Sequence, residues 1–179
     1  MLSFNVAGLL RSAPGTARHY DVHETALEIA GDLRLAAPID GEVRLSNTGR
    51  SIIARAALTT ALEEHCARCL TPIEAPISVV IEEEALPSVD LETGHALDVS
   101  SEPDAFRIDD HHELDLGQPV REAISLAEPI APLCRPDCLG LCIVCGAELN
   151  DLPGHDHGAT PVDPRLAMLA EWRAPDDSD

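Results

Sequence analysis

The chain lacks several features that mark common protein classes. Lys is absent, so all 12 basic residues among the 179 are Arg, and 32 acidic residues bring the formal charge to −20. No apolar run approaches the ~18 residues that a membrane-spanning helix needs, and the basic stretch of a signal peptide is missing from the first residues. Aromatic side chains are limited to two Phe, one Tyr and one Trp. The 45% of apolar residues nevertheless suffices for one core.

The shortage of cations also limits the function. A general basic surface that wraps nucleic acid needs clustered Lys and Arg against the phosphates. We therefore expect a cytoplasmic protein whose partners are basic.

The charge is uneven along the chain and divides it into segments. Residues 1–81 hold nine acids and seven Arg, whereas residues 82–115 hold twelve acids and only Arg107. We expect 1–81 to form the sheet half and 82–115 an acidic loop insert, either simply solvated or a docking surface. Residues 116–172 are expected to hold a helix, a Cys/His-rich segment and a last helix, followed by a disordered tail, 173–179. All belong to one domain.

The first half reads mostly as strand. Apolar residues alternate with polar ones from Ile52 to Leu62 and again from Ile77 to Ile81, which is the period of a half-buried strand. The residues between these runs, 65–72, must form a turn. Shorter strand candidates are 19–27 and 42–45, so we expect an antiparallel meander or a partly open barrel.

The period changes after residue 115. Leu116, Val120, Ile124 and Ala127 share a helical face, with Asp115 as a candidate cap. A last helix is expected from 163 to near 172. The predicted class is therefore α+β: an antiparallel sheet followed by a C-terminal helical, Cys-rich segment stapled by zinc.

Cysteines and two late histidines occur at metal-binding spacings. The pairs are Cys66-x2-Cys69, Cys134-x3-Cys138, Cys142-x2-Cys145 and His155-x-His157. Thiolates and imidazoles supplied in tight pairs suit tetrahedral zinc. Disulfides would need an oxidising compartment, a redox Cys-x2-Cys would need a βαβ context, and an iron–sulfur cluster stays a rival because spacing cannot exclude it.

The pairing of these eight candidate ligands has two solutions. In one, Cys66, Cys69, Cys134 and Cys138 form a first zinc site, and Cys142, Cys145, His155 and His157 a second. In the other, the four cysteines from 134 to 145 close a single compact site. In both schemes the zinc sites are closed and structural, because they lack the vacant coordination position that catalysis needs.

Catalytic motifs are missing from the sequence. It contains no His-Glu-x-x-His, no phosphate-binding Gly loop and no Gly-x-Ser-x-Gly. His111 and His112 lie among acids and are expected in an exposed loop. We expect a protein that is not an enzyme and has no small-molecule substrate; a zinc-dependent hydrolase or nuclease and a Cys-x2-Cys redox protein are the alternatives.

The cysteine segment also resembles a known family. The segment 66–70 after a strand, the run 132–150 and the segment 163–166 resemble the YceD-type large ribosomal RNA subunit accumulation proteins, as does the start, 4–9. The resemblance implies a bacterial or plastid ribosome biogenesis factor that supports 23S rRNA accumulation. Family members often carry Cys-x-Cys where this chain has His155 and His157, which supports a metal role for both.

Two partners are consistent with that role. An acidic protein can hold a basic large-subunit ribosomal protein, with residues 82–115 as the attractive surface. Alternatively, Arg44, Arg50, Arg55 and Arg68 of the sheet half would contact rRNA phosphates in the pre-ribosomal particle.

Overall fold

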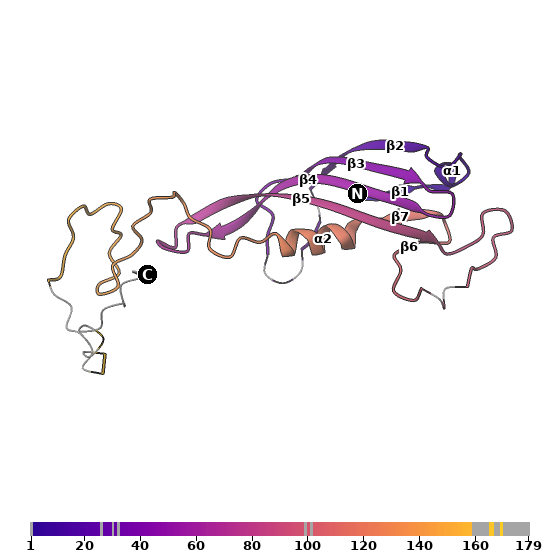
Figure 1. Cartoon of the computed structure of the whole chain (residues 1–179). Coiled ribbons are helices and arrows are strands. Elements are labelled where there is room, and N and C mark those ends of the chain that lie inside the picture. The colour runs from indigo at the N-terminus through magenta and orange to yellow at the C-terminus, as the bar shows by residue number, and fades with distance from the viewer. Residues whose placement is uncertain are drawn as a thin grey trace, which may run out of the picture.

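The structure, a computed structural model, describes residues 2–25, 27–29, 31, 33–98, 100, 102–158, 165, 166 and 169. Its main feature is one long, curved sheet with the strand order β2-β3-β4-β5-β6 (Figure 1). The strands are β2 (Ala17–Glu24), β3 (Ile39–Asn47), β4 (Ile52–His65), β5 (Pro72–Pro87) and β6 (Arg107–Ile108). Neighbours from β2 to β5 are antiparallel, and β6 is parallel to β5. The predicted antiparallel meander is confirmed, and it is open rather than a barrel.

The two runs in which apolar and polar residues alternate form the longest strands of the sheet. The Ala-rich run from Ile52 forms a 14-residue strand, and the run around Ile77 lies within a 16-residue strand. Alternate residues of β4 are buried, and Leu58 pairs with Val79 on the inner face. Burial of this apolar face stabilises the sheet by about 25 cal/mol per Å² removed from water, which outweighs the helix preference of Ala.

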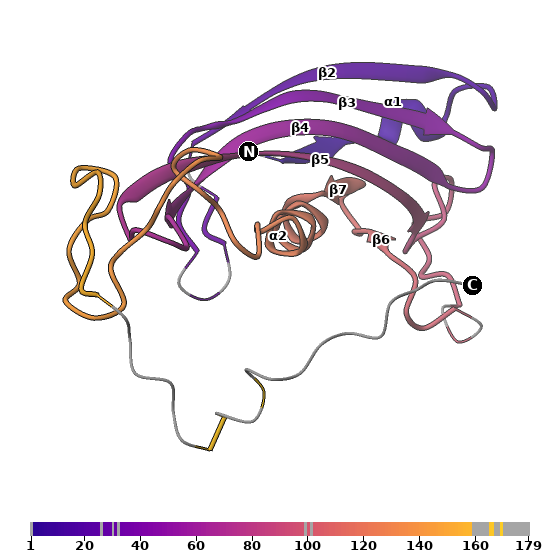
Figure 2. The same ribbon diagram turned by 60° about the vertical axis from the view of Figure 1, so that its left-hand side comes forward.

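The concave face of the sheet is covered by one helix and a second, small sheet. Helix α2 (Gly117–Leu126) lies in this concavity (Figure 2) and buries Val120 and Ile124 against the strands. Strands β1 (Ser3–Asn5) and β7 (Glu113–Asp115) pair antiparallel, next to the short helix α1 (Ala7–Leu10). The predicted helix is thus confirmed. The N-cap position is taken by Leu116 rather than by Asp115. The Asp115 carboxylate, two positions before the helix begins, accepts a hydrogen bond from the Gly117 amide at 2.8 Å.

Part of the expected acidic insert is ordered structure. Strand β5 runs on to Pro87, and β6 and β7 also fall within 82–115. The prediction that residues 82–115 form one loop is wrong for these strands. Buried residues such as Ile81, Ala85 and Leu114 continue the core into this part of the chain. The remaining loop, 88–106, projects from one end of the molecule.

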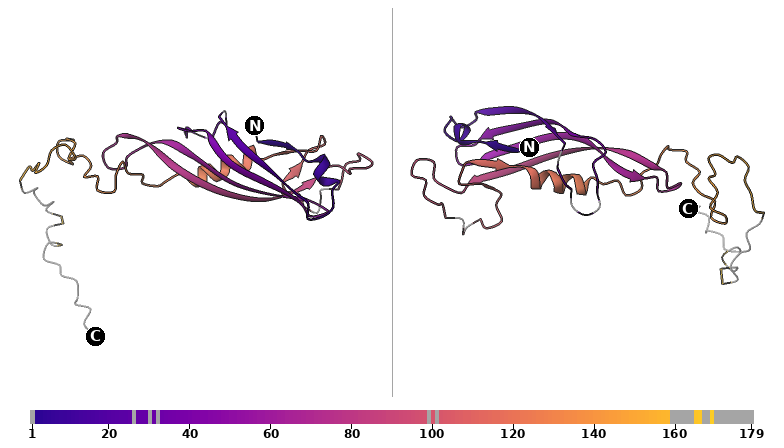
Figure 3. Two further views of the ribbon diagram at one scale, coloured as in Figure 1. Left: turned by 90° about the horizontal axis from the view of Figure 1, so that it is seen from above. Right: turned by 180° about the vertical axis from the view of Figure 1, so that it is seen from behind.

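The opposite end is a two-stranded arm. Strand β3 pairs with β4 as far as Thr59, and residues 34–36 then bond to residues 61–63. Beyond them β4 and β5 continue as a pair to their turn at 66–71. The Cys-rich segment that follows α2 lies beyond this end of the arm (Figure 3). The predicted last helix, 163–172, falls outside the described residues except for 165, 166 and 169, and the tail 173–179 lies outside them entirely. None of the helices described is long and apolar enough to cross a membrane.

Candidate metal centres

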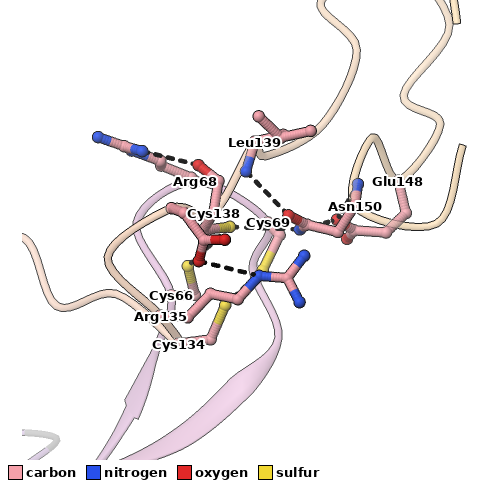
Figure 4. Close-up of polar contacts among 10 residues, drawn as sticks. Cys66, Arg68, Cys69, Cys134, Arg135, Cys138, Leu139, Glu148 and Asn150 are labelled. Carbon is pink, nitrogen blue, oxygen red and sulfur yellow. Dashed lines mark hydrogen bonds and ion pairs between the residues drawn. The ribbon is translucent and has the colours of Figure 1, made fainter. Parts of the chain in front are cut away.

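The turn at the end of the arm and the segment after α2 bring four cysteines together. The Sγ atoms of Cys66 and Cys138 lie 3.8 Å apart, and those of Cys69 and Cys134 lie 3.6 Å apart. All four sulfurs lie within 4.8 Å of one another. Cys66, Cys69 and Cys138 are buried and form a small core of their own with Leu133 and Leu141. We call this set of four the first group (Figure 4).

The backbone of the turn is shaped around the first group. Leu70 takes the left-handed conformation (φ 62°), and its amide donates to the Cys66 carbonyl at 2.9 Å. Backbone amides of Cys69, Cys134 and Arg68 point at the Cys66 sulfur and lower the pKa of that thiol to about 6. Amides that stabilise a thiolate in this way are typical of metal-binding turns.

The second group consists of Cys142, Cys145, His155 and His157. The Cys145 sulfur lies 3.3 Å from Nε2 of His155 and 3.2 Å from Nε2 of His157. Backbone amides of Cys145 and Val144 lower the pKa of the Cys142 thiol to about 6. This group is more open than the first, because Cys145 and His157 are exposed and Cys142 and His155 are half-buried.

A glycine makes the second turn possible. Gly146 has φ 74° and donates its amide to the Cys142 carbonyl at 2.8 Å. This is the left-handed position at which a residue without Cβ carries no steric penalty.

The donor geometry can be compared with a tetrahedral metal. Zinc–sulfur bonds of about 2.3 Å place sulfurs about 3.8 Å apart on a tetrahedron, and the first group shows 3.6 and 3.8 Å. For sulfur–nitrogen and nitrogen–nitrogen edges the values are about 3.6 and 3.3 Å. The second group shows 3.2 to 3.3 Å, and 2.9 Å between the two imidazoles. It therefore fits after an expansion of a few tenths of an ångström.

The chemistry of the first group also calls for a cation. Burial and hydrogen bonds to the neighbouring thiols raise the pKa of Cys134 to about 12. By contrast, the Asn150 amide lowers the pKa of Cys138. Four sulfurs at these distances cannot all be thiolates without a positive charge among them. A divalent metal held by the four sulfurs would supply that charge and would link the segments that carry them.

Two residues contact the first group although the sequence did not predict that contact for either. Nδ2 of Asn150 donates to the Cys138 sulfur at 3.3 Å, and the Arg68 guanidinium donates to the Cys138 carbonyl at 2.7 Å. Arg68 was considered only as a phosphate contact. No periodicity or spacing marks Asn150, since its contact depends on how two loops meet.

The eight residues singled out from the sequence fall into two groups with the composition of the two-site scheme. Cys134 and Cys138 lie with Cys66 and Cys69, not with Cys142 and Cys145 as the compact scheme requires. All six cysteines are free thiols. His111 and His112 belong to neither group and lie in the turn before β7, where His111 is exposed.

The candidate phosphate contacts lie mostly in ion pairs or hydrogen bonds. Arg55 forms a two-point pair with Glu82 on β5 at 2.8 and 3.0 Å. Arg50 lies 3.5 Å from Glu84. Arg44 is exposed and directly opposite Arg55 in the β3–β4 register.

Comparison with known proteins supports the resemblance seen in the sequence. Residues 54–172 match the family described as large ribosomal RNA subunit accumulation protein YceD. Uncharacterised proteins of Mycobacterium tuberculosis and Mycobacterium bovis are 33% identical over 161 residues, which is 88% of this chain and 74% of each relative. A chloroplastic YceD homologue of Zea mays is 42% identical over 38 residues, or 21% of this chain and 13% of its own. No solved structure matches the chain.

The match includes both candidate metal centres and leaves out β1, α1, β2 and β3. It covers well over half of the chain, and the mycobacterial relatives align along most of their own length. The chain therefore belongs to the YceD family, the large ribosomal RNA subunit accumulation proteins.

Proposed function

We propose that this protein is a non-enzymatic ribosome biogenesis factor of the bacterial cytoplasm. It supports the synthesis, processing or accumulation of 23S rRNA by holding a basic large-subunit ribosomal protein until the rRNA is ready to receive it. Family membership supports the process. The choice of a basic protein over rRNA as the direct partner follows from the charges described next.

The choice of a basic protein over rRNA rests on one observation: most of the candidate arginines of the sheet half already contact an acceptor within the protein. Arg55 is engaged by Glu82, Arg50 by Glu84, and Arg68 by the Cys138 carbonyl. A paired guanidinium has to break its partner contact before it can bind a phosphate, which removes part of the electrostatic gain. These three arginines are therefore poor contacts for rRNA, which leaves Arg44 as the exposed candidate among the four.

Within the described part of the chain, by contrast, the acids of the projecting loop form no ion pair with an arginine. Glu92, Asp98, Glu102 and Asp104 are exposed on the loop 88–106, and Arg107 donates to the Glu102 carbonyl rather than to a carboxylate. A concentrated negative field at one end of an elongated molecule attracts a cationic partner and speeds its association. This end lies far from the Cys-rich segment (Figure 1).

We further propose that both groups bind zinc as structural sites. Each group offers four protein donors, which complete a tetrahedral shell and leave no vacant position for a substrate. Such a closed shell supports a binding role over the hydrolase or nuclease alternative. The full burial of Cys66 argues against the redox alternative, since a redox thiol must be reached by its partner.

The partner proposal is tested by affinity capture at low salt, followed by identification of the retained protein and RNA. The wild type should retain a basic large-subunit protein in the absence of rRNA. Replacing Glu92→Gln, Glu102→Gln and Asp104→Asn together should reduce this capture by tenfold or more.

A matched control removes three negative charges from the outer face of the sheet instead of from the loop. The variant Asp21→Asn, Glu42→Gln and Glu74→Gln alters three exposed acids there and should capture the partner like the wild type. Retention of rRNA alone, with no basic protein, would contradict the partner proposal. Metal-dependent RNA cleavage by the purified protein would favour the enzyme alternative instead.

A further inference from the structure

Asn150 belongs to one metal group by its place in the chain and to the other by its contacts. It lies between Cys145 and His155, inside the loop that the second group closes. Its side chain nevertheless reaches the first group, where Nδ2 donates to the Cys138 sulfur at 3.3 Å (Figure 4). Its Oδ1 accepts the Leu139 amide at 2.9 Å.

Further contacts hold the two loops together. The Leu149 amide donates to the Gly140 carbonyl at 2.9 Å, and Leu141 and Glu148 form a β-bridge. The Glu148 carboxylate contacts Nδ2 of Asn150 and orients the amide. The loop 146–154 therefore forms one wall around Cys138.

The opposite wall comes from the turn at the end of the arm. The Leu141 amide donates to the Arg68 carbonyl at 3.2 Å, and the Arg68 guanidinium donates to the Cys138 carbonyl. Gly140 suits this place because its φ of 77° favours glycine and because a Cβ atom would lie only 3.0 Å from the Arg68 carbonyl oxygen. The segment 138–141 is thus enclosed between the arm and the loop of the second group.

Apolar burial contributes little to holding that loop in place, so its few hydrogen bonds and the closure at the second group fix its position. Asp151, Leu152, Pro153 and Gly154 are exposed, and the loop adds no buried residue to either hydrophobic core. Closing it at Cys145 and His155 lowers the entropy cost of placing Asn150 against Cys138. An amide that donates to a ligating thiolate stabilises its charge and fixes its orientation.

We propose that Asn150 couples the two metal centres, so that metal in the second group strengthens metal binding by the first. This inference rests on the metal binding proposed above. Asn150 is a positioning residue: it binds no metal itself and acts through Cys138. Coupling of this kind is reciprocal, so the first metal strengthens the second by the same factor.

The test is metal competition on the full-length, reduced protein. Cobalt(II) or zinc is titrated against a chelator of known affinity, and bound metal is counted. The first group offers four sulfurs and the second two, so the intensity of thiolate-to-cobalt absorption tells which group is filled. The wild type should bind two ions.

Three variants separate coupling from simple loss of a site. Cys142→Ser should remove the second ion and weaken the first by about 10- to 100-fold, the usual effect of losing an outer-shell contact. Asn150→Ala should keep both ions and weaken the first by a similar factor. Combining the two should weaken the first site no further, because Asn150 acts only when the second group is filled.

The control is Asp151→Asn, a change at an exposed neighbour in the same loop, which should leave both affinities unchanged. Unchanged first-site affinity in Cys142→Ser, or full additivity of the two changes, would overturn the coupling while leaving both metal sites intact. A wild type that binds no metal would overturn the metal proposal itself. If Cys142→Ser fails to fold, the first-site affinity of Asn150→Ala still tests the proposal, and an unchanged affinity in that variant would overturn it.

Discussion

Removing the metal with a chelator is expected to unfold residues 134–158 while the curved sheet stays folded. The two regions have separate cores. The sheet core includes Leu58, Val79 and Ile124, whereas the first group forms a small cluster of three cysteines with Leu133 and Leu141. Within 134–158 only Cys138 and Gly140 are buried. Apolar burial therefore contributes little to holding this segment.

The magnitude follows from the size of the segment. Ordering about 25 residues costs at least roughly 25 kcal/mol in backbone entropy. Hydrogen bonds within the segment and to the arm recover about 1 kcal/mol each, or roughly 10 kcal/mol in all. The deficit of roughly 15 kcal/mol is within the range that one or two structural zinc ions provide. Without them the segment cannot stay ordered.

Hydrogen exchange read by mass spectrometry measures this directly. After chelation, peptides from 134–158 should exchange at the rate of an unfolded chain, while peptides from 52–62 in β4 keep their protection. The double variant Cys66→Ala and Cys142→Ala, kept in zinc, should behave like the chelated wild type. If 134–158 stays protected once metal analysis shows none bound, the reasoning about what holds the segment is wrong.

Other changes have equally defined outcomes. Asn47→Ala should lower the free energy of unfolding by about 2–4 kcal/mol in urea denaturation, because the buried amide donates to the carbonyls of Leu9 and Ser12 and accepts the Gly49 amide; a loss below about 1 kcal/mol would argue against it. Gly41→Ala should destabilise β3 by about 1–3 kcal/mol, since a Cβ there would lie 2.1 Å from the carbonyl oxygen of Ala57 on β4, and an unchanged thermal midpoint would count against this clash. Acidification should weaken metal binding steeply once the pH falls below about 6, because protons then compete for the Cys66 and Cys142 thiolates, whose pKa in the metal-free protein is about 6 against an ordinary value of 9. In the metal-free protein these lowered pKa values add stability that is full above pH 9 and is lost as the pH falls through about 6; a metal affinity that does not change between pH 7.5 and pH 5 would contradict this.

Local patterns identified most of the sheet and the central helix. The period-two run from Ile52 to Leu62 and the helical face from Leu116 to Ala127 each carry their own burial pattern. Their neighbours only had to provide something apolar to pack against. The short strands β1, β6 and β7 escaped prediction, because two or three residues show no period and their pairing is set by distant partners, such as Phe4 with Leu114.

The candidate metal residues show the same division. Thiols and imidazoles in tight pairs can be recognised in the sequence, since the chemistry of a metal ligand belongs to the residue and its spacing. Their grouping could not be chosen, because it depends on whether the end of the arm meets the segment after α2. The structure brings Cys66 and Cys138, 72 positions apart, to 3.8 Å.

The sequence by itself determined the long strands, the central helix, the types of candidate ligand and the excess of acids over arginines, since each of these depends on residues close together in the chain. Only the tertiary structure decided which cysteines share a group, which arginines meet a carboxylate across neighbouring strands and where the Asn150 amide points. These depend on distances between segments that fold against one another. A hydrogen bond or metal bond forms only within a few ångströms, whereas spacing along a chain does not specify distance in space.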